Sequence, residues 1–235
     1  MAKFSGRTRK VLVLAASSPL LGLAGWRFWT RHSFFEPFTS ETDPLFQSAY
    51  LQKFNPHHNP SEDDCCVRLV PLTRLRADLG EDALNGGPKL IEAFAAGLWG
   101  GFGFAIQRAI MKRAFLNDTN KNDLWEKEEL LKSLYEPGTI VSDHFIVLEK
   151  TPRAIILRGG LSPRESPNEP REMDNICEMT VDVNKEGNAA VFRYKNIYFQ
   201  GLGHQKSKPF SPPMVWLHRQ YCLLLIEAAV RNCIE

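Results

Sequence analysis

Two histidines lie in sequence patterns that suit proton transfer. His144 follows Asp143 in a run that alternates like a strand, which puts His144 on the same face as Ile146. His218 lies one turn into the last predicted helix, where helical spacing places it on a largely apolar side with Cys222. Imidazole suits general acid–base catalysis because its protonation changes near neutral pH. The alternative for both residues is a structural histidine held by hydrogen bonds.

Aromatic residues gather on one face of the last predicted strand. By alternation, Phe192, Tyr194 and Tyr198 share that face. An aromatic wall with two phenols suits flat ligands, and Tyr194 is the phenol that we predict to move a proton. We predict that Trp99 and Trp216 also line the ligand site. Plain core packing is the alternative.

Arg158 ends a predicted strand next to a loop rich in proline. A guanidinium at such a point could bind an anionic group of a ligand. The alternative is a solvated charge at the edge of the sheet.

Other catalytic and metal-binding patterns are missing from the sequence. His57 and His58 lie in a proline-flanked loop without a further histidine or cysteine at ligand spacing, so we predict no metal site. The chain has no GxSxG elbow and no local Cys-His signature. We therefore predict no cofactor.

The cysteines indicate structural thiols. Their number is odd, and no pair has the CxxC spacing of a zinc or redox site. In an oxidising lumen one disulfide could form, and the sequence does not identify the pair. The five cysteines are Cys65, Cys66, Cys177, Cys222 and Cys233.

The first 35 residues indicate where in the cell the protein is located. They carry six basic side chains and no acidic one, and they enclose an uncharged apolar run of 16 residues, 11–26. About 20 apolar residues are needed to cross a bilayer core, so the run is marginal. Trp26, Phe28 and Trp29 alternate with arginines, as in an interfacial aromatic belt.

Three interpretations of this leader stay open. In an uncleaved signal anchor, the four basic residues before the run and the two after it would keep the N-terminus in the cytosol. Gly22 and Ala24 would permit cleavage of a signal peptide after Ala24, and an acid-free start is also typical of a mitochondrial leader. We predict a single-pass membrane protein of the endoplasmic reticulum or secretory pathway, with a mitochondrial protein as the alternative.

Without the leader, the chain is mildly acidic. Of 29 basic side chains 23 remain, against 27 acidic ones. A domain with a net negative charge and without a basic stripe is a poor nucleic-acid binder, so we predict no nucleic-acid partner. About 200 residues suffice for one core. The sequence leaves open whether the chain forms a homo-oligomer.

The elements that must position these residues follow in a clear order. Residues 36–64 are predicted to be a tether and surface loop, and residues 65–235 one α+β pocket domain. The predicted strands are 66–70, 139–150, 154–158, 177–183 and 190–200, with a loop at 159–171. The predicted helices are 88–115, 122–135 and 214–234, the last entered through Ser211 and two prolines.

The predicted helix 88–115 carries two rows of residues spaced by four. Such rows are the ridges that interdigitate when helices pack, and the four glycines of GLWGGFG predict a bend. We expect this helix to pack on a sheet or a partner helix; a phosphate-binding glycine loop and a second membrane segment are the alternatives. The small row is Ala93, Gly97, Gly101, Ala105 and Ala109, and the bulky row is Leu90, Phe94, Leu98, Phe102, Ile106 and Ile110.

The order of elements is that of the helix-grip fold, in which an antiparallel sheet wraps around a long C-terminal helix and leaves a pocket between them. The stretches VRLVPLTRLRADL, LIEAFAAGLWGGFGFAIQR, DHFIVLEKT, FQGLG and PPMVWLHRQYCLLLIEAAVRN resemble a family of uncharacterised fungal proteins, some encoded near specialised-metabolite pathways. That family is similar to the START and polyketide-cyclase-like group. The resemblance implies a cavity for a bulky apolar molecule and specifies no reaction.

Three functions follow as hypotheses. The first is a membrane-tethered, cofactor-free cyclase, isomerase or dehydratase that acts on a hydrophobic metabolite. The second is a lipid or metabolite carrier without catalysis. The third is a membrane assembly factor whose ridge of small residues packs on a partner protein.

Overall fold

The computed structural model describes residues 22, 24–184 and 186–235, in two units that are described separately. In the first unit, Met1–His32, residues 24–29 are helical. The rings of Trp26 and Trp29 lie 5.5 Å apart, and the Arg31 guanidinium lies 3.9 Å from the centre of the Phe28 ring. Most of the predicted membrane helix, residues 11–26, lies outside the described residues.

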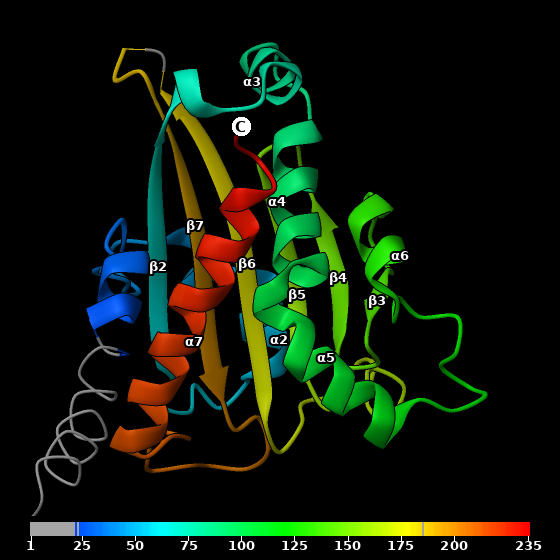
Figure 1. Ribbon diagram of the computed structural model, residues 1–235. Coiled ribbons are helices and arrows are strands. Elements are labelled where there is room, and N and C mark those ends of the chain that lie inside the picture. Colours follow the sequence, from blue (N-terminus) through cyan, green and yellow to red (C-terminus); the bar gives the residue numbers. More distant parts are fainter. Residues whose placement is uncertain (1–21, 23, 185) are drawn as a thin grey trace, which may run out of the picture. The chain divides into compact units, whose positions relative to one another are not determined.

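The second unit, Ser33–Glu235, is built on one open antiparallel sheet of seven strands in the order β1-β2-β7-β6-β5-β4-β3 (Figure 1). This confirms a mixed α+β fold. The strands are β1 (Ser33–Glu36), β2 (Glu62–Pro71), β3 (Ile140–Val141), β4 (Phe145–Lys150), β5 (Ala154–Gly160), β6 (Asp174–Asn184) and β7 (Ala189–Phe199).

Helical elements cover both faces of the sheet. In Figure 1, α4 and α7 run along the near face, and α2 lies behind the sheet. The helices are η1 (Pro44–Gln47), α2 (Ala49–Phe54), η2 (Leu72–Arg74), α3 (Ala77–Leu84), α4 (Lys89–Gly100), α5 (Phe102–Phe115), α6 (Lys127–Lys132) and α7 (Pro212–Arg231).

Alternation along β6 and β7 produces a core on each face. Phe192 of β7 packs its ring 5.1 Å from that of Phe94 in α4. On the opposite face, Ile176 of β6 forms a buried cluster with Leu45 and Phe54. The central strands are therefore buried from both sides.

The bend predicted in residues 88–115 is confirmed. Gly101 has an extended backbone (φ −71°, ψ 174°) and separates α4 from α5, whose axes differ by 54°. No single helix among the described residues is long and apolar enough to cross a membrane, whereas α4 and α5 as a bent pair have sufficient length and composition.

The ridge of small residues packs on α7. A Cβ atom added to Gly97 would lie 2.4 Å from the backbone oxygen of Ala229, and one added to Gly101 would lie 3.4 Å from the Ala228 side chain. The predicted close approach of a neighbouring backbone is thus provided by this chain's own C-terminal helix.

Replacing Gly97 with alanine is expected to lower the free energy of unfolding by about 1–3 kcal/mol, because the added methyl group overpacks the α4–α7 contact. Gly80 of α3 is the matched control. There a Cβ atom would lie 3.8 Å from the Leu75 side chain, an ordinary contact, so Gly80→Ala should stabilise the protein by up to ~1 kcal/mol. Urea unfolding of both variants measures the difference, and equal effects would contradict the assigned contact.

Residues 36–64, predicted to be a tether and surface loop around a helix-compatible stretch at 45–54, are folded against the sheet in the structure. This segment contains η1, α2 and the start of β2, and it buries Leu45 and Phe54 against the sheet. Asp43 caps η1 through its side chain and forms an ion pair with Lys195 of β7 (2.7 Å). The segment is therefore part of the folded domain.

Two further predictions between residues 122 and 150 are corrected. The helix is limited to α6, where Glu126 and Glu129 form a capping box. The predicted strand 139–150 is interrupted after β3 by Ser142 and Asp143, which adopt left-handed φ angles of 49° and 59°. His144 therefore lies in a turn and not in a strand, because two consecutive left-handed residues reverse the chain.

Candidate functional site

A cavity of about 640 Å³ lies beside the segment that joins β1 to β2. Its volume falls in the usual range of small-molecule sites, roughly 300–1,000 Å³. Aromatic, amide and hydroxyl side chains line it together with one carboxylate. The lining residues are Phe38, Thr39, Ser40, Phe46, Gln47, Leu51, Gln52, Asn55, His58, Asn59, Pro60, Ser61 and Asp63.

Two buried asparagines shape the wall of this cavity. Asn55 and Asn59 hydrogen-bond through side chain and backbone (3.0 and 2.8 Å). The Asn59 amide also donates to the carbonyls of Gln200 and Gly203, at 2.6 and 2.8 Å. The loop is therefore fixed to the chain that follows β7.

Asp63 is the carboxylate that faces the cavity. Burial raises the pKa of Asp63 to about 6, although a hydrogen bond with Ser61 and the charge of Lys208 act in the opposite direction. Its Oδ1 atom is buried and has no hydrogen-bond partner within the described part of the chain. A carboxyl group with a raised pKa in the wall of a cavity is a candidate binding group for a ligand.

The sequence analysis missed Asp63. The only signal was two consecutive acids, Asp63 and Asp64, before an apolar strand, where one of two neighbours must face inward. In the structure both are covered: Asp63 faces the cavity, and Asp64 meets His218 of α7.

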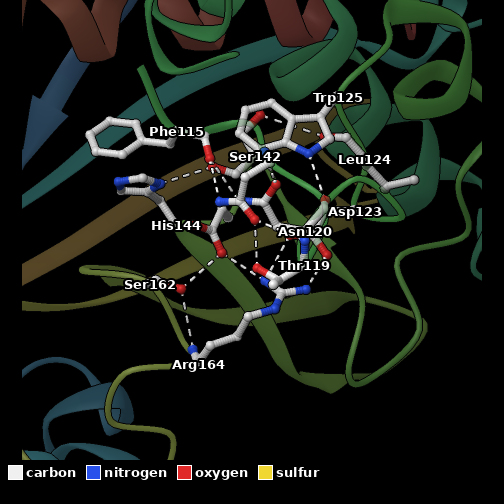
Figure 2. Close-up of polar contacts among 12 residues, drawn as sticks. Phe115, Thr119, Asn120, Asp123, Leu124, Trp125, Ser142, His144, Ser162 and Arg164 are labelled. Carbon is white, nitrogen blue, oxygen red and sulfur yellow. Dashed lines mark hydrogen bonds and ion pairs between the residues drawn. The ribbon is translucent and has the colours of Figure 1, made fainter. Parts of the chain in front are cut away.

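His144 is held as a structural side chain (Figure 2). Its Nδ1 atom donates to the Ser142 carbonyl at 2.9 Å, and its ring packs edge-on against Phe115. None of the four cavities described in this part of the chain is lined by His144.

Below His144, Arg164 bridges two carboxylates (Figure 2). Its guanidinium contacts Asp123 and Asp143 at 2.6 Å each, and Ser162 donates to Asp143 at 2.8 Å. These bonds raise the pKa of Arg164, the hydrogen bond with Asp123 most of all. The cluster fastens the loop after β5 to the strained turn before β4.

His218 meets a carboxylate and a thiol at the sheet. Its Nε2 atom lies 2.7 Å from Oδ2 of Asp64 and 3.3 Å from Sγ of Cys222. Asp64 also accepts a hydrogen bond from Asn196 at 3.1 Å. These three side chains, Asp64, His218 and Cys222, are called the α7 cluster below.

Three of the predicted site residues lie in the core. Tyr194 is buried, and burial raises its pKa well above the ordinary value, so its phenol does not exchange protons near neutral pH. Phe192 packs on Phe94, and Trp99 packs on Phe104 with ring centres 5.1 Å apart. The positions of these three residues fit core packing, which was the alternative interpretation from the sequence.

Of the remaining predicted residues, Tyr198 meets a second predicted residue, His218, edge-on, with ring centres 5.0 Å apart. Trp216 is exposed on α7. Arg158 is fully buried and bound by Asp174, so the prediction that it binds an anionic ligand is not supported by its position.

None of the four cavities described lies at the hollow predicted beneath α7. Leu225, Ile226 and Ala229 of α7 are buried. The four cavities described here have volumes of about 640, 520, 440 and 360 Å³, and no residue of α7 lines any of them. The largest belongs instead to the segment before β2.

All five cysteines are free and buried. Burial raises the pKa of each thiol, which argues against a reactive thiolate. The rings of His57 and His204 contact each other at a tilt of 51°, with ring centres 4.3 Å apart, a pairing that the sequence did not predict.

The chain matches no family model, no curated protein and no solved structure. The resemblance to fungal proteins of the polyketide-cyclase-like group therefore remains a prediction.

Proposed function

We propose that the protein binds a small molecule in the cavity lined by Asp63. The observation that carries this proposal is the carboxyl group of Asp63, a residue that lines a 640 Å³ space and whose pKa is raised by burial. Phe38 and Phe46, with ring centres 4.7 Å apart, provide apolar surface next to it. The occupant is accordingly a molecule with a flat apolar part and a hydrogen-bond donor, such as a phenolic metabolite.

Binding is common to the enzyme and carrier hypotheses. In a cyclase, isomerase or dehydratase, Asp63 would accept a substrate proton; in a carrier it would only hold the donor. At the level of fold we propose the helix-grip type, supported by an antiparallel sheet that is followed by a long helix on one face. The site lies on the other face.

Fluorescence titration with 2-naphthol and 2-methoxynaphthalene tests the proposal on the full-length protein. We expect the hydroxyl compound to bind roughly ten- to a hundredfold more tightly, because a hydrogen bond to a charged group contributes about 1.5–3 kcal/mol. Asp63→Asn should remove most of this preference. Ser40→Trp should weaken both probes by filling the cavity.

Glu41→Trp is the matched control, since Glu41 is exposed next to Ser40 and does not line the cavity. It should leave both affinities unchanged. Equal affinities for the two probes, or loss of binding in Glu41→Trp as in Ser40→Trp, would reject this site. Mass spectrometry of molecules that co-purify with the wild type and Asp63→Asn distinguishes substrate conversion from carriage.

We also propose attachment to a membrane through the N-terminal segment. The ring contact between Trp26 and Trp29 and the contact of Arg31 with the Phe28 ring support it, because such residues favour the bilayer interface. The third hypothesis, a partner helix on the ridge of small residues, is weakened because α7 already occupies that ridge. Co-sedimentation with liposomes of the full chain and of a chain lacking residues 1–32 tests the attachment; equal binding would contradict it.

A further inference from the structure

The geometry points to a divalent metal site in the α7 cluster, of the kind that takes Zn²⁺. Asp64 of β2 and His218 and Cys222 of α7 place one oxygen, one nitrogen and one sulfur within 4.8 Å of one another. The residues lie on the opposite side of β2 from the Asp63 cavity. The inference therefore goes beyond the proposed function and does not depend on it.

The Nε2 atom of His218 lies close to both of the other candidate ligands. Nε2 of His218 lies 2.7 Å from Asp64 Oδ2 and 3.3 Å from Cys222 Sγ, and Sγ lies 3.8 Å from Asp64 Oδ1. One N–H group can point at only one of the two partners. A cation between the three atoms would satisfy all of them, because each can offer it a lone pair.

A buried amide beside the cluster provides an independent observation. Asn196 is fully buried; its Nδ2 atom lies 3.1 Å from Asp64 Oδ1 and 3.7 Å from Cys222 Sγ, and its Oδ1 atom has no hydrogen-bond partner in the described chain. As placed, the NH₂ group of Asn196 faces the cluster and donates to Asp64, whereas a bound cation would favour the opposite orientation of the amide, with its oxygen toward the cluster. It then becomes a fourth ligand, and otherwise its NH₂ group orients Asp64 as an outer partner.

The ligand types select the metal. Thiolate, imidazole and carboxylate together suit Zn²⁺ or Co²⁺, whereas Mg²⁺ and Ca²⁺ prefer oxygen alone. His218 and Cys222 are four residues apart on α7 and therefore lie on one face of the helix. The His218 side chain is 11% exposed, which gives the cluster an edge at the surface. Binding forms the three metal–ligand bonds and releases the thiol proton of Cys222 to solvent. The Nε2 proton of His218 moves to Nδ1 through solvent, which frees the Nε2 lone pair for the metal.

Cobalt titration of the full-length protein, freed of metal with a chelator, tests the inference. We expect one Co²⁺ per chain, a thiolate-to-cobalt absorption band, and displacement of Co²⁺ by Zn²⁺. Cys222→Ser should abolish the band, and Asp64→Asn and His218→Gln should each weaken Zn²⁺ binding at least tenfold. Cys233→Ser is the control, because this buried thiol contacts only the Ala229 carbonyl among the hydrogen bonds described and should leave the band intact.

Each outcome decides the question. The absence of a band in the folded wild type, a band that persists in Cys222→Ser, or stoichiometry that falls equally in Cys233→Ser would overturn the site. Circular dichroism in chelator shows whether each variant is folded. Should Asp64→Asn not fold, His218→Gln gives the same answer, since His218 lies nearer the surface.

Discussion

Replacing Arg158 with methionine is expected to lower the free energy of unfolding by about 3–5 kcal/mol, because it leaves the buried Asp174 carboxylate without its counter-charge. The pair is bidentate, at 2.8 and 2.6 Å, and almost fully shielded from water. The guanidinium also donates to three loop carbonyls and stacks on Phe54 at 3.5 Å. Arg158 thus joins β5, the following loop and α2 at one point.

Arg164 provides the matched control on the same loop. It binds two carboxylates that are 5% and 10% exposed, but its own side chain is 35% exposed and water can take its place, so Arg164→Met should cost less than Arg158→Met, about 1–2 kcal/mol. Urea unfolding gives both free energies. Limited proteolysis should cut the loop after β5 faster in Arg158→Met than in Arg164→Met. Similar losses of stability would mean that Arg158 is a peripheral charge, as the alternative interpretation from sequence held.

The sequence predicted the elements in which apolar or small residues recur at regular spacing. Strict alternation identified β6, where Cys177, Met179 and Val181 are buried, and the glycines of GLWGGFG located the break at Gly101. The elements missed are short or lack periodicity. β1 has four residues and is defined by its pairing with β2, and the left-handed turn before His144 uses serine and aspartate where glycine would have signalled it.

Long-range contacts explain what the sequence did not reveal about the sites. The spacing of His218 and Cys222 was visible on the predicted helix, but their partner Asp64 is more than 150 residues away in the chain. The Asp63 cavity was hidden for a related reason. Residues 38–61 are polar and rich in proline, which is typical of a loop, and only their contacts with distant residues such as Lys195 and Gln200 make them a wall.

Replacing Lys195 with methionine is expected to remove about 3–5 kcal/mol of stability and to loosen the wall of the cavity. The ammonium group pairs with Asp43 before η1 and with Glu178 of β6, at 2.7 and 2.6 Å, and its side chain is 8% exposed. Without it, two buried carboxylates remain uncompensated. Because Asp43 lies between Ser40 and Phe46, which line the cavity, this variant should also bind 2-naphthol less tightly.

The loss in Lys195→Met should depend on pH. Desolvation raises the pKa of Glu178 even in the wild type and outweighs its attraction to Lys195, because one cation serves two acids. Desolvation alone would lower the pKa of Lys195, but the two carboxylates raise it. A raised carboxyl pKa means that the folded state binds the proton more tightly than the unfolded state, so stability falls as pH rises above the ordinary glutamate value of about 4.3.

The difference between wild type and Lys195→Met should therefore be larger at pH 8 than at pH 5, where Glu178 in the variant is partly protonated. Arg193→Met is the control on the same strand: Arg193 is 25% exposed and pairs with partly exposed Glu36 and Asp182, so its loss should cost about 1 kcal/mol or less. Denaturant unfolding at both pH values provides the comparison. A pH-independent loss in Lys195→Met would show that the ammonium group acts by packing and not by neutralising buried charge.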